Sequence, residues 1–118
     1  MAHDTALFVY GSLKLGFRHA DVLSGAQHGG AAAAAPFTLV RYGDYPALVP
    51  AASGVVHGEL AFVDRGLLAT LDEFEGCPTS YQRHTIRLID GRAAQAYLIS
   101  VEVARAYPPI PGGIWREG

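Results

Sequence analysis

The sequence predicts a single α+β domain, or a small β-barrel with one or two helices packed beside it. Short apolar runs separated by glycine, proline and aspartate are typical of strands joined by turns. One longer segment, 64–76, instead has apolar residues at helical spacing. With 118 residues and 50% hydrophobic composition, the chain is long enough to bury a core of its own. We therefore expect one domain over residues 1–118.

The first third of the chain contains one clear strand. Residues 6–10 form an apolar and aromatic run that ends at Gly11, which indicates a buried strand leading directly into a turn. Residues 17–23 predict a short helix or turn. The glycine and alanine tract 29–35 is too simple in composition to be assigned to an element.

Two more strands are predicted in the middle of the chain. Residues 37–40 and 54–63 have the composition of strands, and residues 43–46 predict a turn between them. Gly58 lies inside the second run, where a glycine indicates a bulge or the close approach of another backbone.

Segment 64–76 is the clearest helix in the sequence. Asp64 is a suitable N-cap, and Gly76 is a suitable stop. The apolar residues fall at the spacing of one buried face: Leu67, Leu68, Leu71 and Phe74.

The remainder of the chain predicts a hairpin and an irregular tail. The runs 81–89 and 93–101 flank the pair at 90–91, Asp-Gly, which favours a tight turn, so the sheet should be at least partly antiparallel. From Tyr107 onward, prolines and glycines exclude a regular helix or a central strand, and Trp115 is expected to fix this tail to the body.

Composition and charge exclude several classes of function. The formal charge is -2, 17% of the residues are charged, and the nine basic residues are scattered, which argues against nucleic acid as a partner. The single cysteine, Cys77, cannot form an internal disulfide, and neither it nor the five histidines belongs to a metal-binding motif. We therefore expect no metal and no cofactor.

The amino terminus and the hydropathy pattern indicate a cytoplasmic protein. Residues 1–5 lack the basic and then apolar layout of a signal peptide. No apolar run approaches the roughly 20 residues of a membrane span, so no membrane association is expected. A reducing compartment suits a chain with one cysteine.

Glu75 has an unusual position on the predicted helix. With about 100° per residue and Leu67 at zero, Glu75 falls at about 80°, inside an apolar face centred at about 30°, whereas Glu73 falls at about 240° on the solvated side. Burial and the negative end of the helix dipole would both raise the pKa of Glu75 towards neutrality, as acid/base catalysis requires. The alternative is a helix that ends by Glu75 and leaves an ordinary solvated carboxylate.

The turn after the first strand is a second candidate. Successive backbone N–H groups there can form a nest for a carboxylate or an oxyanion, and a plain Gly-Ser turn is the alternative. The residues concerned are Tyr10, Gly11, Ser12 and Leu13. Several aromatic residues are candidates either for the lining of a pocket or for ordinary core: Tyr42, Tyr45, Tyr81, Tyr97 and Trp115.

Two blocks of the sequence have the form of a family signature. Residues 8–16 read FVYGSLKLG, and residues 71–83 read LDEFEGCPTSYQR. They resemble, in the right order, the FVYGTLKxG and LDxFEGxPxxYxR motifs of the gamma-glutamylcyclotransferase-like (AIG2-like) family, and they are most similar to its gamma-glutamylamine cyclotransferase branch. Weaker similarities are GDYP at 43–46 to the family's GxYP turn and VHGE at 56–59 to its VxGE strand.

The resemblance implies a compact mixed fold around a small β-barrel, with a pocket at its mouth. It implies Glu75 as the acid/base and the main-chain groups of residues 10–13 as the binding site for the glutamyl part of a small-molecule substrate. We take Tyr45 and Tyr81 as further binding residues. The implied reaction converts a gamma-glutamyl amine or amino acid to 5-oxoproline and a free amine without a cofactor.

The leaving amine and the class of function stay open at this stage. The family handles gamma-glutamyl amino acids, gamma-glutamyl-lysine from crosslinks and gamma-glutamyl groups in natural-product assembly. A non-catalytic small-ligand binding protein of the same fold is the alternative from a different class. The position of Glu75 relative to residues 10–13 separates these readings. The sequence does not indicate an oligomeric state.

Overall fold

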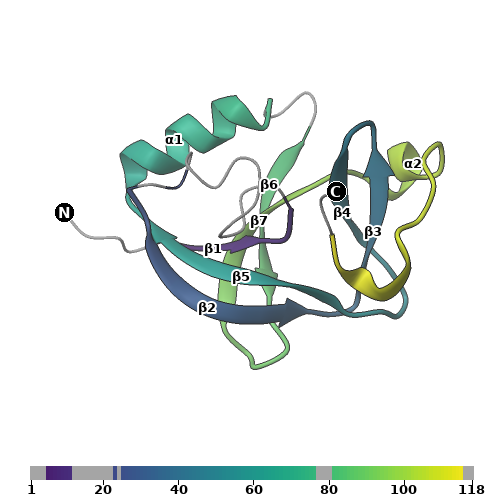
Figure 1. The fold of residues 1–118 in the computed structure, drawn as a ribbon, viewed down its shortest axis with the longest axis horizontal. Coiled ribbons are helices and arrows are strands. Elements are labelled where there is room, and N and C mark those ends of the chain that lie inside the picture. The colour runs from purple at the N-terminus through teal and green to yellow at the C-terminus, as the bar shows by residue number, and fades with distance from the viewer. Residues whose placement is uncertain (1–4, 12–22, 24, 77–80, 116–118) are drawn as a thin grey trace.

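The computed structural model describes residues 5–11, 23, 25–76 and 81–115 (Figure 1). These residues form one mixed sheet of seven strands, curled into a half-barrel, with two helices. The strands are β1 (Thr5–Val9), β2 (Gln27–Ala34), β3 (Phe37–Tyr42), β4 (Tyr45–Pro50), β5 (Val56–Val63), β6 (Gln82–Arg87) and β7 (Ala93–Leu98). The helices are α1 (Arg65–Phe74) and α2 (Val101–Ala104), and a 3₁₀ turn follows at Pro111–Gly113.

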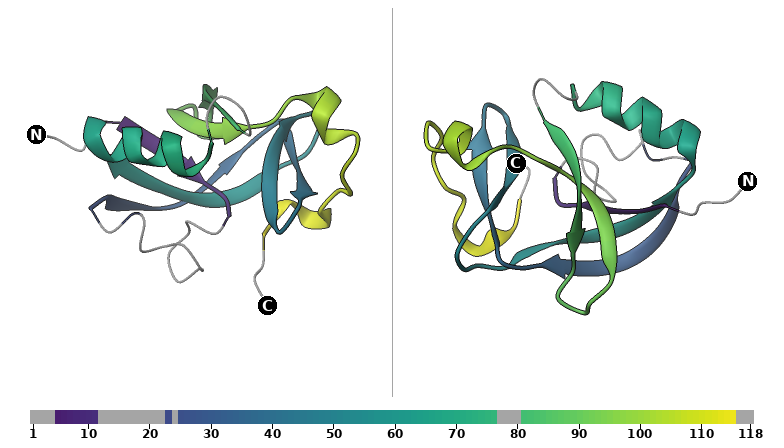
Figure 2. Two further views of the ribbon diagram at one scale, coloured as in Figure 1. Left: turned by 90° about the horizontal axis from the view of Figure 1, so that it is seen from above. Right: turned by 180° about the vertical axis from the view of Figure 1, so that it is seen from behind.

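The strand order places the end of β1 near the start of β4. The order is β2-β5-β1-β7-β4-β3, and β6 also pairs with β7. Both β1 and β4 run parallel to β7, β1 through Leu7 opposite Gln95 and β4 further along through Leu48 opposite Leu98. The remaining strand pairs are antiparallel. The helix α1 lies over the end of the sheet formed by β1 and β5, and α2 lies beside the β3–β4 hairpin (Figures 1 and 2).

Alternating side chains give the sheet two apolar faces. One face packs against α1 through Leu71 and includes Leu7, Tyr81 and Tyr97. A second cluster lies on the other face: Phe8, Tyr10, Leu39, Leu48, Leu60, Ile86 and Leu98. Successive residues of β1 and β7 alternate between these clusters, as the two-residue repeat of a strand requires.

The predicted α+β class is confirmed, as are the elements with clear local signals. The strands predicted at 6–10, 37–40 and 54–63 are β1, β3 and β5. The predicted helix is α1, where Asp64 accepts a hydrogen bond from the N–H of Leu67 at 2.8 Å. The hairpin around 90–91 is β6–β7.

The predictions for Gly58 and Trp115 are also confirmed. A Cβ on Gly58 would overlap the carbonyl oxygen of Val9, so β5 needs glycine where it crosses β1 closely. Trp115 is buried, and the guanidinium of Arg41 lies over its ring at 5.0 Å.

Two predictions about element boundaries were wrong, and one segment that the sequence left unassigned is a strand. The unassigned tract 29–35 belongs largely to β2, which pairs with β5 along its length, because pairing overrides the weak strand preference of alanine and glycine. The turn predicted at 43–46 is confined to 43–44, and β4 begins at Tyr45 despite the proline at its second position. The strand predicted at 93–101 ends at Leu98, because Ser100 caps α2 by accepting a hydrogen bond from Val103.

Candidate active site

Glu75 lies at the carboxyl end of α1, where its backbone N–H donates to the carbonyl of Leu71 at 2.9 Å. Gly76 follows with a φ of 72°, the left-handed conformation that ends many helices. Glu75 is half-buried, and the burial of its carboxyl group raises its pKa from 4.5 to about 7. The direction agrees with its predicted place on the apolar face, and the carboxyl group can exchange a proton near neutral pH.

Tyr10 joins two strands through its hydroxyl group. The hydroxyl donates a hydrogen bond to the carbonyl of Tyr97 at 2.5 Å and accepts one from the N–H of Leu48 at 3.2 Å. Burial, followed by the electrostatic interactions with Tyr81 and Glu75, raises the pKa of Tyr10 well above its ordinary value. The phenol is therefore occupied within the sheet, while the Glu75 carboxylate lies within electrostatic range of it.

Gly11 and Tyr81 both contact Pro46 at the start of β4. A Cβ on Gly11 would lie 2.8 Å from Cγ of Pro46, so a larger residue would displace the proline ring. The Tyr81 hydroxyl donates a hydrogen bond to the carbonyl of Pro46 at 2.8 Å. Burial first, and then the charge of Glu75, raises the pKa of Tyr81. Pro46 thus joins the end of β1 to the residue that precedes β6.

Tyr45 belongs to a group of tyrosines around Tyr81. Tyr42 pairs with Tyr45 across the β3–β4 turn and packs its ring edge-to-face on Tyr81, with centroids 5.5 Å apart. Tyr42 also packs on Tyr107 at 4.8 Å. Tyr45 is 37% exposed, and its charge is among the causes that raise the pKa of Tyr81. These four residues, the tyrosine cluster, form an aromatic wall beside Glu75.

The predicted site residues are thus only partly brought together by the described structure. Tyr10, Gly11 and Tyr81 contact β4, which begins at Tyr45, and Glu75 lies within electrostatic range of Tyr10 and Tyr81. Ser12 and Leu13, the second half of the predicted nest, lie outside the described residues, as does Cys77.

An ion pair between Asp72 and Arg83 was missed in the sequence analysis. The guanidinium of Arg83 contacts both carboxylate oxygens of Asp72, at 2.8 and 3.1 Å, and holds the pKa of Asp72 below its usual value. Both residues lie in the 71–83 block, which was the available signal. Spacing within that block does not indicate that the two side chains meet.

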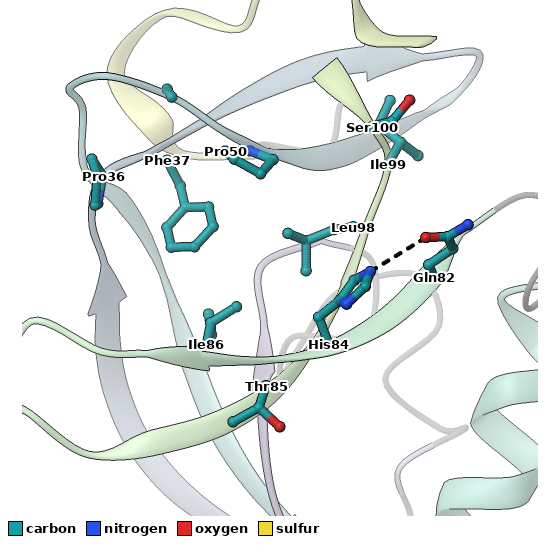
Figure 3. A pocket seen from close by; sticks show the side chains of 11 residues that line it. Pro36, Phe37, Pro50, Gln82, His84, Thr85, Ile86, Leu98, Ile99 and Ser100 are labelled. Atoms are coloured by element: carbon teal, nitrogen blue, oxygen red, sulfur yellow. Dashed lines mark hydrogen bonds between the residues drawn. The ribbon is translucent and has the colours of Figure 1, made fainter. Parts of the chain in front are cut away.

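A pocket of about 530 Å³ lies on the other face of β6 (Figure 3). Phe37, Ile86 and Leu98 point into it, and His84 lies at its edge within 3.3 Å of the Gln82 side chain. Because side chains alternate along a strand, these residues of β6 face away from Tyr81. The pocket does not include Glu75 among its lining residues, so it is separate from the candidate site.

Two negative observations apply to the residues that the structure describes. Among these residues, no group of three or more His, Cys, Asp or Glu side chains is placed to hold a metal ion. Within the same part of the chain, no helix is both long and apolar enough to cross a membrane.

Comparison with known proteins places the chain in a family. Residues 7–117 match the family model described as gamma-glutamyl cyclotransferase, AIG2-like. The chain is 40% identical over 102 residues to the human gamma-glutamylaminecyclotransferase, covering 76% of this chain and 67% of the human protein. It is 35% identical over 113 residues to the Bos taurus gamma-glutamylaminecyclotransferase, covering 87% of this chain and 67% of that protein.

A solved structure gives the same result for the fold. The crystal structure of an AIG2-like protein from Mus musculus superimposes with a TM-score of 0.81 at 26% identity, covering 99% of this chain and 97% of that chain. The chain belongs to the gamma-glutamyl cyclotransferase, AIG2-like family.

Proposed function

We propose that this protein is a gamma-glutamylamine cyclotransferase, which releases a free amine from a small gamma-glutamyl compound and closes the glutamyl part to 5-oxoproline. The human and bovine relatives are gamma-glutamylaminecyclotransferases, and the aligned stretch covers about two thirds of each. The observation that carries the proposal is the buried Glu75 carboxyl group, with a pKa of about 7, beside the end of β1.

The reaction needs one group that both takes and returns a proton. The substrate's own α-amine attacks its γ-carbonyl carbon, a C–N bond forms, and Glu75 accepts the proton released by the amine. The tetrahedral intermediate then loses its original C–N bond, and Glu75 returns the proton to the departing amine. Atoms and charges balance without an oxidant, a reductant or an added water molecule.

The end of β1 is suited to hold the glutamyl part of the substrate. Gly11 packs closely on the Pro46 ring, and the Tyr10 hydroxyl is already bound within the sheet, so ligand contacts in this turn would come from main-chain groups. Backbone N–H groups in this turn would stabilise the oxyanion of the intermediate, and Ser12 and Leu13 extend this proposed cradle.

The tyrosine cluster is suited to hold the leaving group. Tyr45 is the most exposed of the site residues and lies at the edge of the aromatic wall, where an alkyl chain or a departing ammonium group can pack on the rings. A gamma-glutamyl amine such as gamma-glutamyl-ε-lysine has both an alkyl chain and an amine leaving group. This assignment of the substrate is part of the proposal.

The test measures 5-oxoproline release from gamma-glutamyl-ε-lysine, gamma-glutamyl-alanine and related amides. Glu75→Gln should reduce release by at least about a thousandfold, because it removes the proton-accepting group while retaining the side-chain shape. Glu73→Gln is the matched control, since Glu73 is exposed on the same helix, and it should retain nearly full activity. Release that survives Glu75→Gln would disprove the assigned role. No release from any amide would favour a ligand-binding protein.

A further inference from the structure

Asp72 connects the last turn of α1 to the sheet. Its carboxylate accepts hydrogen bonds from Arg83 Nε at 2.8 Å and from a terminal guanidinium nitrogen of Arg83 at 3.1 Å. It also accepts one from the Tyr97 hydroxyl at 2.7 Å. Asp72 and Arg83 are partly shielded from water, with side chains 30% and 31% exposed. Paired bonds of this kind fix direction as well as distance.

The sheet side of this contact is itself held in place. Arg83 and Tyr97 are cross-strand partners on β6 and β7, as are Thr85 and Gln95. Arg83 donates a third hydrogen bond to the Gln95 amide oxygen at 2.8 Å, and the Gln95 amide donates to the Thr85 hydroxyl at 2.6 Å. The guanidinium therefore presents a fixed pair of donors to the helix.

Tyr97 also links this contact to the end of β1. Its hydroxyl binds Asp72, whereas its backbone carbonyl accepts the hydrogen bond from Tyr10. Tyr10 lies within the electrostatic field of Glu75. One residue of β7 thus holds both the last turn of α1 and the strand end that faces the carboxyl group.

The last turn of α1 carries both Asp72 and Glu75. Leu71 is the fully buried residue of the helix, and Phe74 is 45% exposed. Glu75 follows Asp72 by three residues, so the two side chains are neighbours on the helix surface. A displacement of Asp72 from the sheet would carry Glu75 with it.

We propose that Asp72, Arg83 and Tyr97, which we term the helix clamp, are positioning residues that hold the Glu75 carboxyl group in its buried place facing Tyr10. The catalytic consequence rests on the proposed function of Glu75, but the positioning itself does not. Loss of the clamp should let the helix end move outward, which would expose the carboxyl group and misplace it relative to the substrate. Displacements of about 1 Å can cost roughly a hundredfold in rate.

The pKa of Glu75 reports this movement independently of activity. Burial is the cause that raises this pKa to about 7. Tyr10, after β1, and Tyr81, before β6, lie within electrostatic range of Glu75, and their own raised pKa values keep their phenols neutral in this range. Asp72 and Arg83 are the charged groups of the clamp.

Two variants disturb the clamp without changing the charge. Tyr97→Phe removes only the hydroxyl group that binds Asp72, and Arg83→Lys replaces the two-point contact with a single charge. Asp90→Asn is the control, because Asp90 forms an exposed ion pair with Arg92 in the β6–β7 turn, away from α1. The carboxyl carbon of Glu75 is followed by ¹³C NMR from pH 3 to 9, with Glu75→Gln identifying its signal.

The clamp predicts that the Glu75 pKa falls from about 7 towards 4.5 in both clamp variants and stays at about 7 in Asp90→Asn. It also predicts that kcat falls by about 10-fold to 100-fold with little change in KM. An unchanged pKa in folded Tyr97→Phe and Arg83→Lys would overturn the clamp, whatever the activity. A lowered Glu75 pKa in the clamp variants, together with no 5-oxoproline release by the native chain, would support the clamp and disprove the proposed function. If Arg83→Lys fails to fold, Tyr97→Phe decides the question.

Discussion

Tyr81 donates a hydrogen bond from its hydroxyl group to the backbone carbonyl of Pro46, 2.8 Å away. The two residues are 35 positions apart, and the hydrogen bond joins the segment before β6 to the start of strand β4. Gly11 contacts the ring of the same proline. The start of β4 is therefore fixed by Tyr81 and by the end of β1, on the side where Glu75 lies.

Tyr81→Phe should destabilise the protein by about 1–3 kcal/mol. The change leaves the buried Pro46 carbonyl without the Tyr81 donor, and the cost of an unsatisfied buried acceptor exceeds the net value of an ordinary hydrogen bond. Urea unfolding measures this change, which should lower the midpoint urea concentration and leave the m-value unchanged. Tyr45→Phe is the control at the exposed end of the cluster, with an expected change within about 0.5 kcal/mol. Equal effects at the two positions would contradict this account.

Gly11→Ala should lower both stability and activity. The new Cβ would lie 2.8 Å from Cγ of Pro46, whose ring is held in β4, so the end of β1 must shift by several tenths of an ångström. Overpacking of this kind costs about 1–3 kcal/mol. Thermal unfolding and 5-oxoproline release measure the two effects.

Gly66→Ala is the matched control for that substitution. Its new Cβ would meet only Asp64 Oδ1 at 3.6 Å, an ordinary contact, and alanine is favoured over glycine inside a helix by about 0.5–1 kcal/mol. Gly66→Ala should therefore raise the melting temperature. A Gly11→Ala protein as stable and active as this control would exclude a tight contact between β1 and Pro46.

The pH dependence of the reaction should follow Glu75. As a base it must be ionised, and with a pKa of about 7 half of it is ionised at neutrality. We therefore expect kcat/KM to fall about tenfold for each pH unit below about pH 6.5. Initial rates from pH 5 to 9 at low substrate concentration provide the measurement. A profile that is flat from pH 5 to 8 would assign the proton transfer to another group.

Features of this site that depend on neighbouring residues could be predicted from the sequence, whereas contacts between residues distant in the sequence could not. The unusual place of Glu75 follows from the periodicity of one helix, which is local, so it was predicted before the fold was known. The reverse holds for Asp72 and Arg83, which are eleven positions apart in the sequence and meet only because the fold brings the last turn of α1 to β6 and β7. Pro46 was likewise assigned to a turn, because its role comes from Gly11 and Tyr81, which are distant in the sequence.

The fold shows the same dependence. β2 is formed by alanines and glycines that have no strand periodicity, and it exists because β5 offers a complete edge for pairing. By contrast, α1 and the β6–β7 hairpin carry their own signals in Asp64 and in the pair at 90–91.

Glu75 should also make the stability of the protein depend on pH. Its carboxyl group is ionised above about pH 4.5 in the unfolded chain but only above about pH 7 in the folded chain, so folding takes up a proton between these values. The contribution of Glu75 to stability is therefore complete below pH 4.5 and is lost as the pH rises through 7. A shift of this size corresponds to at most about 3 kcal/mol.

Glu75→Gln removes this titration. The variant should match the native chain in stability at pH 4 and exceed it by up to about 3 kcal/mol at pH 8, because a buried carboxylate is then replaced by a neutral amide. Chemical unfolding of both proteins at several pH values provides the comparison, with Glu73→Gln as the exposed control. A difference that stays constant from pH 4 to 8 would mean that Glu75 is solvated in the folded protein. The low-dielectric position required for its role as acid and base would then be excluded.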